Sequence, residues 1–291
     1  MSQSITPDNA AGAAATDDLP TLRLRPRSGW QGLDLSELWH YRDLLFFLAA
    51  RDIKVRYKQT FLGVAWALLQ PLTAMIIFSI FLGILVKVPS DPGIPYPIFV
   101  LCGLLPWQLF SQSLTQASNS LIENERLITK IYFPRLLIPF ASILAGLLDF
   151  AIALVLFAFL MLYFHVPLRP TILLLPLLVA FVVMTALAVG LWLSALNAQY
   201  RDFRYALPFI VQVWFYASPV VYPNSIIPVQ WQILYGLNPM AGVIEAFRWA
   251  LLGNTHPAWP LLAASAAAVV VLFVGGLLYF RKMEATMADW V

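Results

Sequence analysis

Long apolar runs constrain this chain more than any other feature of its sequence. A helix needs about 20 consecutive apolar residues to cross a bilayer. Runs suited to a crossing occur at 61–86, 98–118, 136–164, 171–196, 207–222 and 259–280. Only 11% of the 291 residues are charged, whereas a soluble domain carries about 25%, so the chain lacks the charges needed to cover a folded surface in water. The sequence therefore predicts an all-α integral membrane fold with six transmembrane helices.

The segments outside these runs divide the chain further. Residues 1–33 are rich in Ala, Ser, Asp, Thr and Pro, which predicts a disordered cytoplasmic segment. They lack the apolar core of a cleaved signal peptide. Residues 34–58 are predicted to form an amphipathic interface helix, residues 59–282 the six-span domain, and residues 283–291 a cytoplasmic tail.

The predicted helix at 34–58 combines apolar and basic residues. Leu45, Ala49 and Ile53 recur at four-residue spacing, which indicates one apolar helix face. The basic end of the helix consists of Arg51, Lys54, Arg56 and Lys58. A helix of this kind is expected to lie along the membrane interface. It would serve either as a membrane-surface anchor or as a docking platform for a partner, and the pattern alone does not separate the two.

Basic residues also predict the orientation of the spans. With six crossings, only Lys87, Arg169 and Arg248 of the 18 basic residues fall on one side, and the other fifteen share the side of both termini. Lys and Arg concentrate on the cytoplasmic side of membrane proteins. Both termini are therefore predicted to be cytoplasmic. Membrane orientation, rather than nucleic-acid binding, accounts for the net charge of +3.

The sequence lacks the common catalytic and metal-binding motifs. It contains no GxxxxGK[ST] phosphate loop, no HExxH pair and no GxSxG elbow. The chain is therefore not expected to hydrolyse ATP or to carry a catalytic residue. Its single cysteine, Cys102, lies in an apolar run, which excludes a disulfide framework or a thiolate metal site. No cofactor or metal is expected in this chain.

Two acidic residues lie in apolar surroundings. Asp149 falls past the predicted bilayer midplane of the third span, where an ionisable side chain is a candidate functional group. A polar contact with a neighbouring helix is the simpler interpretation. Glu245 and Arg248 are three residues apart, so they are predicted to neutralise each other across one helical turn.

The loop at 119–135, between the second and third spans, has the pattern of a short amphipathic helix. Ser120 and Glu123 fit a capping box, in which Ser120 caps the helix start and Glu123 reaches back to it. Leucines and isoleucines then alternate with charged residues until Pro134. Such a helix suits either insertion into a groove of a soluble partner or an ordinary position on lipid headgroups.

The fifth run and the segment after it are unusual for a spanning helix. Run 207–222 is short and contains prolines. Residues 223–256 are predicted to be re-entrant or outward-facing, because an interrupted helix at membrane depth needs shelter from lipid. Aromatic rings gather here, and Trp214, Phe215 and Tyr216 adjoin polar neighbours. The rings would belong either to an interfacial belt and core packing or to a path along which sugar faces slide, as nucleobases do on aromatic platforms.

A set of motifs, each weak alone, becomes specific when taken together. The set is Arg51–Thr60, Leu62-Gly63, Trp66, Leu69–Leu72, Leu105-Pro106-Trp107, Asn124–Arg135, Tyr200-Arg201-Asp202, Ser218-Pro219-Val220, Tyr222-Pro223, Asn238-Pro239-Met240, Glu245 and Arg248. Over residues 36–282 it resembles the ABC-2 type polysaccharide exporter permeases.

The resemblance implies a half-transporter of the cell inner membrane that homodimerises and pairs with two copies of a separate ABC ATPase, which binds ATP and Mg. It also implies a cytoplasmic coupling helix that seats on the ATPase, re-entrant outer helices before the last span, and a lipid-linked glycan substrate such as O-antigen, capsular polysaccharide or teichoic acid. Residues expected to couple to the ATPase are Ser120, Glu123, Glu125, Arg126, Lys130, Tyr132 and Arg135. Residues expected to line the substrate path are Trp107, Asp149, Phe209, Trp214, Phe215, Tyr216 and Tyr222.

Two other functions stay open. An ABC-2 permease for a drug or lipid cargo would have the same architecture, and only bound-substrate or gene-loss data separate it from a glycan exporter. A membrane-embedded glycan ligase or polymerase would need outward-facing acids, bases and nucleophiles, which are scarce in this sequence.

The basic-residue asymmetry generates a test of topology. A reporter fused after residue 285 is expected to be active only if it is a cytoplasmic reporter, and one fused near Asn224 or Asn254 only if it is an outward reporter. Activity of the two reporter types is measured in whole cells. An outward carboxyl terminus would show that the 207–222 segment does not cross.

Overall fold

The computed structural model describes residues 39–58, 63–131, 133–200, 202–253 and 259–284. Every regular element in these ranges is helical, which confirms the predicted all-α fold. The described helices belong to one compact unit. The predicted disordered segment 1–33, Tyr132 and residues 285–291 of the predicted tail lie outside the described residues.

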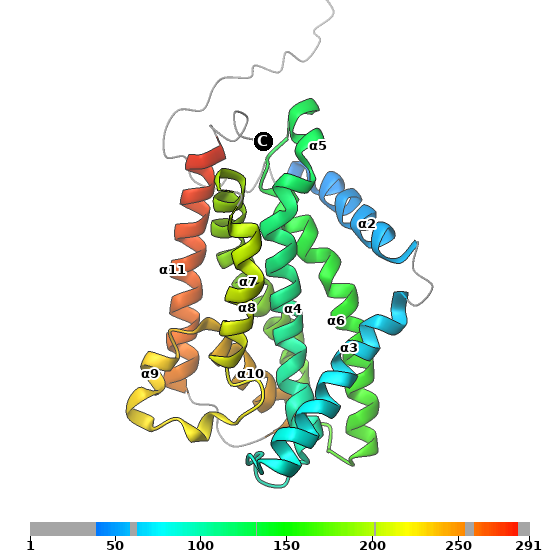
Figure 1. Ribbon diagram of the computed structural model, residues 1–291, viewed down its shortest axis with the longest axis vertical. Helices are drawn as coiled ribbons and strands as arrows, with labels where there is room; N and C mark the ends of the chain where they lie inside the picture. Colours follow the sequence, from blue (N-terminus) through cyan, green and yellow to red (C-terminus); the bar gives the residue numbers. More distant parts are fainter. Residues whose placement is uncertain (1–38, 59–62, 132, 201, 254–258, 285–291) are drawn as a thin grey trace, which may run out of the picture. The chain divides into compact units, whose positions relative to one another are not determined.

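Within the described ranges, five helices are long and apolar enough to cross a membrane. They are α3 (Gly63–Phe78) with its π-helical continuation η1 (Ser79–Leu85), α4 (Tyr96–Glu123), α6 (Leu137–Tyr163), α7 (Leu175–Gln199) with the preceding 3-10 turn η2 (Pro170–Leu174), and α11 (Trp259–Glu284). Figure 1 shows them running alongside one another. Five of the six predicted runs therefore coincide with helices of spanning length.

The fifth predicted run forms a shorter helix than a crossing requires. Residues 207–222 contribute to α8 (Phe203–Tyr216), which has 14 residues, and a turn begins at Ala217. At 1.5 Å per residue α8 is about 21 Å long, whereas the hydrocarbon core is about 30 Å thick. A sixth crossing therefore stays a prediction.

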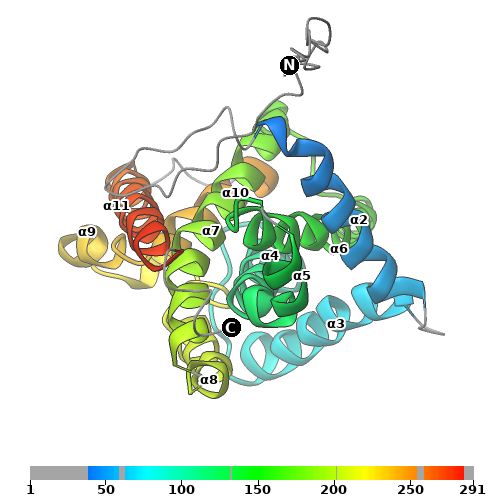
Figure 2. The same cartoon turned by 90° about the horizontal axis from the view of Figure 1, so that it is seen from above.

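Helix α4 lies at the centre of the helix packing. It contacts α3, α6, α7, α8 and α10, and Figure 2 shows these helices around it. In α4, 78% of the most apolar stretch is buried, against 17–33% in the other four spanning-length helices. The other four have a smaller share of fully buried side chains, as expected of helices at the edge of the packing. Burial of Phe99, Leu105, Phe110 and Leu114 makes α4 the element on which the rest of the core is built.

Helix α2 (Arg42–Lys58) lies against α6. Leu48 and Ala49 are buried there, in a small cluster that includes Ala141 of α6. Phe46 and Phe47 are exposed on the other side of α2. The helix therefore carries apolar side chains on more than one face, and one of these faces is already occupied by protein.

The chain between α8 and α11 forms short helices and turns. These are η3 (Asn224–Ile226), η4 (Val229–Trp231), α9 (Gln232–Tyr235) and α10 (Pro239–Leu252). Helix α10 has 14 residues, of which twelve are buried. The Asn238 side chain accepts a hydrogen bond from the Met240 amide and so caps its start, which is the usual role of asparagine at this position. At this length α10 does not span a bilayer, and burial supplies the shelter from lipid that the sequence predicted for an interrupted segment.

Arg248 of α10 is a fully buried cation held by backbone carbonyls. Its Nη2 donates to the Val220 carbonyl at 2.7 Å and its Nη1 to the Tyr222 carbonyl at 3.0 Å. The guanidinium carbon lies 3.8 Å from the ring centre of Phe99, which is cation–π geometry. Within the described residues Arg248 forms no direct ion pair with Glu245, so the predicted neutralisation across one turn stays a prediction. Two of its three guanidinium nitrogens donate instead to the turn that follows α8, and Nε has no partner. A single residue thereby holds α10, that turn and α4 together.

This arrangement predicts the effect of Arg248→Lys. A lysine ammonium lacks the planar fork that reaches two carbonyls at once, and a lost buried hydrogen bond costs about 1–3 kcal/mol. We expect a lower yield of folded protein and a lower melting temperature in detergent. Arg204→Lys, at an exposed position of α8, is the matched control, and equal stability of the two variants would contradict the role of Arg248.

Candidate functional site

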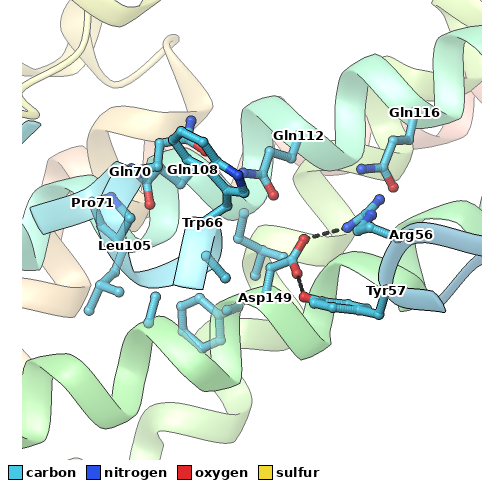
Figure 3. Close-up of a pocket in the computed structure, with 14 residues that line it drawn as sticks. Arg56, Tyr57, Trp66, Gln70, Pro71, Leu105, Gln108, Gln112, Gln116 and Asp149 are labelled. Carbon is cyan, nitrogen blue, oxygen red and sulfur yellow. Dashed lines mark hydrogen bonds and ion pairs between the residues drawn. The ribbon is translucent and has the colours of Figure 1, made fainter. Parts of the chain in front are cut away.

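A cavity of about 330 Å³ opens between the end of α2 and helices α3, α4 and α6. Its volume falls within the range of about 300–1,000 Å³ that is common for small-molecule sites. Figure 3 shows side chains from all four helices converging on it. Arg56 and Tyr57 enter from α2, Trp66 and Gln70 from α3, and Asp149 from α6.

Asp149 is the centre of a polar contact between α6 and α2. Its carboxylate forms an ion pair with Arg56 and accepts a hydrogen bond from the Tyr57 hydroxyl. The two interpretations of Asp149 are therefore compatible: it makes a helix–helix contact, and it also lies on the cavity wall. Burial, reinforced by the hydrogen bond to Asp149, raises the pKa of Tyr57 to about 12. The Tyr57 hydroxyl consequently keeps its proton at physiological pH.

The basic end of α2 divides into two groups. Lys54 and Lys58 are exposed, as the predicted interface helix requires. Arg51 and Arg56 instead turn toward the protein and bind acidic side chains. Of the four basic residues predicted for the interface helix, only Lys54 and Lys58 therefore point away from the helix packing.

Four glutamines line the cavity, and the sequence predictions did not include them. Gln108, Gln112 and Gln116 come from α4 and Gln70 from α3. Their signal was present in the sequence, because the three on α4 are spaced by four residues, which places them on one helix face.

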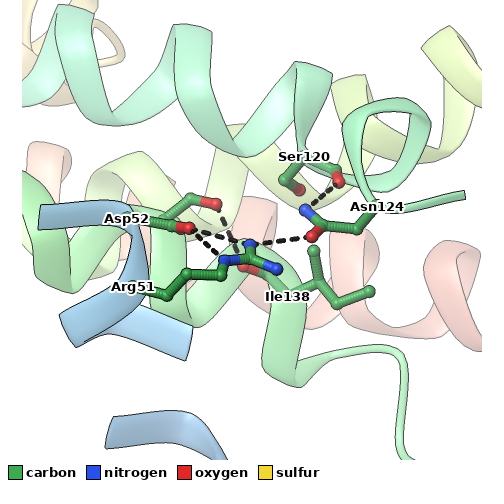
Figure 4. A network of polar contacts seen from close by, with 6 residues as sticks. Arg51, Asp52, Ser120, Asn124 and Ile138 are labelled. Carbon is green, nitrogen blue, oxygen red and sulfur yellow. Dashed lines mark hydrogen bonds and ion pairs between the residues drawn. The ribbon is translucent and has the colours of Figure 1, made fainter. Parts of the chain in front are cut away.

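A second polar network joins α2 to the point where α4 ends (Figure 4). Arg51 Nη2 donates to Asp52 Oδ1 and to Asn124 Oδ1, each at 2.8 Å. Asn124 Nδ2 in turn donates to the Ser120 carbonyl at 2.8 Å. Asn124 is the junction between α4 and the short helix α5 (Glu125–Lys130). Arg51 therefore ties α2 to the corner from which α5 projects.

The predicted capping box is wrong. Ser120 lies inside α4, where its hydroxyl donates to the Ala117 carbonyl at 2.7 Å, and Glu123 is the last residue of α4. The helix continues past Ser120 because Ser120 and Leu121 are buried against neighbouring helices, so no new start is needed there. The chain breaks at Asn124 instead, and α5 is one and a half turns long.

The predicted coupling residues differ in how far they are exposed. Glu123, Glu125, Arg126 and Lys130 are exposed, whereas Ser120 is buried. Arg135 donates from Nη1 to the Glu284 carbonyl at 2.8 Å, which ties it to the end of α11. The exposed charges on and beside α5 thus form the part of the set that is accessible to another molecule.

The predicted path aromatics also separate into packed and exposed rings. Trp107 and Phe215 have ring centres 5.5 Å apart, and Trp214 packs at 5.1 Å from Phe110. Trp214 Nε1 donates to Asn238 Oδ1 at 2.8 Å. These contacts place Trp107, Trp214 and Phe215 in a cluster between α4 and α8.

The remaining rings lie elsewhere. Phe209 and Tyr216 are 69% and 63% exposed on α8, so another molecule reaches both rings. The Tyr222 and Tyr235 hydroxyls are 2.9 Å apart, which joins the turn after α8 to α9.

Comparison with known proteins agrees with this arrangement. The family model described as ABC-2 type transporter matches residues 43–252, from α2 to the end of α10. The O-antigen export system permease protein RfbA of Myxococcus xanthus is 31% identical over 258 residues, which cover 85% of this chain and 95% of that protein. A Klebsiella pneumoniae protein of the same name is 31% identical, with 85% and 94% covered. The polysialic acid transport protein KpsM of Escherichia coli is 27% identical, with 83% and 94% covered. The chain belongs to the ABC-2 type transporter family.

Proposed function

We propose that the chain is the permease subunit of an ATP-driven exporter that moves lipid-linked polysaccharide across the cell inner membrane. The observation that carries this proposal is the similarity over 83–85% of the chain to permeases named for O-antigen export and polysialic acid transport. The missing phosphate loop supports a separate ATPase partner, which would bind ATP and Mg. The proposed assembly is a homodimer with two ATPase copies, six crossings in each protomer and both termini cytoplasmic.

In this proposal α5 transmits the movement of the ATPase. Its exposed charges lie next to the corner held by Asn124. Closure of the ATPase on ATP would displace α5, and Arg51 would pass the displacement to α2. Five residues further along, α2 contacts Asp149 through Arg56 and Tyr57, so the same movement would reach the middle of α6. ATP drives this change only because it binds the two conformations with different affinity.

The substrate path in this proposal combines exposed and packed aromatic rings. Phe209 and Tyr216 offer accessible ring faces on α8, and Trp214 and Phe215 hold α8 on the core. A flat apolar face contacts a sugar ring without requiring one particular donor or acceptor. This supports a path that tolerates a long, repetitive polymer.

Deletion of the gene tests the proposed function. Cells that lack the chain are expected to keep synthesising the polysaccharide and to accumulate it, still joined to its lipid, on the cytoplasmic side. Surface polysaccharide is measured with whole-cell labelling and internal lipid-linked glycan by extraction. Normal surface polysaccharide in the deletion strain would rule out the proposed cargo.

The coupling role of α5 is tested by replacing Glu125 and Arg126 together with Ala. We expect normal insertion but weaker co-purification of the ATPase and several-fold lower export, because charged side chains at a contact set orientation and association. Arg42 and Asp43, an exposed pair of opposite charges on α2, are replaced with Ala as the matched control. Unchanged co-purification and export in the α5 variant would remove α5 from the proposed interface.

A further inference from the structure

The four glutamines of the cavity form a row of amides along α4 with one amide facing them from α3. Gln108, Gln112 and Gln116 occupy one face of α4, about 6 Å apart along the helix axis, and Gln70 comes from α3. Seven residues separate Gln116 from the end of α4 at Glu123. The row therefore begins about 10 Å from the α5 end of the helix and continues toward its middle.

These amides have no hydrogen-bond partner among the described residues. Each amide offers two donors and one acceptor oxygen, and an unsatisfied polar group at membrane depth is costly. Asn197 in the core, by comparison, donates from Nδ2 to the Ser118 carbonyl and to Asn119 Oδ1, each at 3.0 Å, although its own Oδ1 has no partner. The glutamine side chains line an open cavity, so their amides face a space that water or a polar ligand can fill.

The charges of the cavity are already matched. Arg56 is paired with Asp149, and Tyr57 also donates to that carboxylate. With the Tyr57 hydroxyl neutral, the cavity carries no net charge. A phosphate or a metal ion would have to displace one member of this pair, whereas a neutral molecule leaves it intact.

Trp66 adds an aromatic surface to the same cavity. Its side chain lines the cavity wall and is 60% exposed. Figure 3 shows the indole beside Gln108 and Gln112. An apolar ring face next to amide donors and acceptors matches a sugar ring, which has apolar faces and a rim of hydroxyl groups.

We propose that this cavity binds neutral sugar units of the lipid-linked polysaccharide, with the glutamine amides on the hydroxyl groups and Trp66 against a ring face. The proposal rests on the proposed function. The volume of about 330 Å³ suits a short stretch of the polymer. The four amides and Trp66 are then determinants of cargo recognition, and successive amides on α4 give a moving chain successive sets of hydrogen bonds.

The test uses the full complex of permease and ATPase in lipid nanodiscs. The probe is the radiolabelled lipid-linked glycan extracted from cells that lack the chain, and the comparison is the lipid obtained from it after its sugars are removed. Gln112→Met and Gln116→Met are combined, because methionine keeps length and helix propensity but removes the amide. We expect the Kd for the lipid-linked glycan to rise about tenfold, since each neutral hydrogen bond contributes roughly two- to tenfold. The Kd for the lipid without sugars should stay unchanged.

Gln230→Met is the matched control, because Gln230 is exposed and lies outside the cavity. Variants are compared per assembled complex, so that a folding defect does not imitate a binding defect. An unchanged Kd for the glycan in the double variant, or an equal rise for the lipid without sugars, would overturn the sugar site while leaving the proposed function intact. If the deletion strain accumulates no lipid-linked glycan, the proposed function itself fails.

Discussion

Polar groups at membrane depth must find partners inside the protein, and this requirement explains how the chain is held together. Lipid offers no hydrogen bonds, so an unsatisfied group costs more there than at a wet surface. Arg248 meets the requirement for Nη1 and Nη2 with the carbonyls of the turn after α8. Asp149 meets it with Arg56 and Tyr57. Each solution joins elements that are distant in the sequence, so satisfying one polar group also positions two or three helices.

Helix α4 connects the features to which the function has been related. Its central position gives it neighbours on all sides. One face presents the glutamine amides to the cavity, another packs Trp107 and Phe110 against α8, and its end at Glu123 leads into α5. A displacement of the α4–α5 corner consequently reaches the cavity without passing through a flexible segment. The glutamines line a cavity, which is why they point to a ligand rather than to packing.

Two arginines of helix α2 bind partners that are far away in the sequence. Arg51 binds Asn124, 73 positions away, and Arg56 binds Asp149, 93 positions away. About one and a half helical turns separate the two arginines, so the helix links the α4–α5 corner to the cavity wall as one rigid piece. The basic end of α2 is thereby a structural connection on one side and an exposed surface, with Lys54 and Lys58, on the other.

The sequence by itself determined the class of fold, the positions of the spanning-length helices and the family. Apolar runs are local, and crossing a bilayer requires a continuous stretch of them, so their ends could be placed from composition. A phosphate loop is a short contiguous motif, so its absence could also be read from the sequence alone. The local pattern was misleading where burial decided whether a helix continues. Ser120 has the sequence pattern of a helix cap, yet it is buried within α4 and the helix continues past it.

Only the tertiary structure decided which polar groups meet. Glu245 is the nearest acidic residue to Arg248 along the helix, but the turn at Val220 and Tyr222 supplies better acceptors because packing brings it against α10. The path aromatics likewise divide into packed and exposed rings according to which side of α8 faces α4. The four-residue spacing of the glutamines on α4 was visible in the sequence. That these glutamines share one cavity with Trp66 and Asp149 was not. Such meetings depend on how α2, α3, α4 and α6 pack, and packing depends on contacts between residues far apart in the chain.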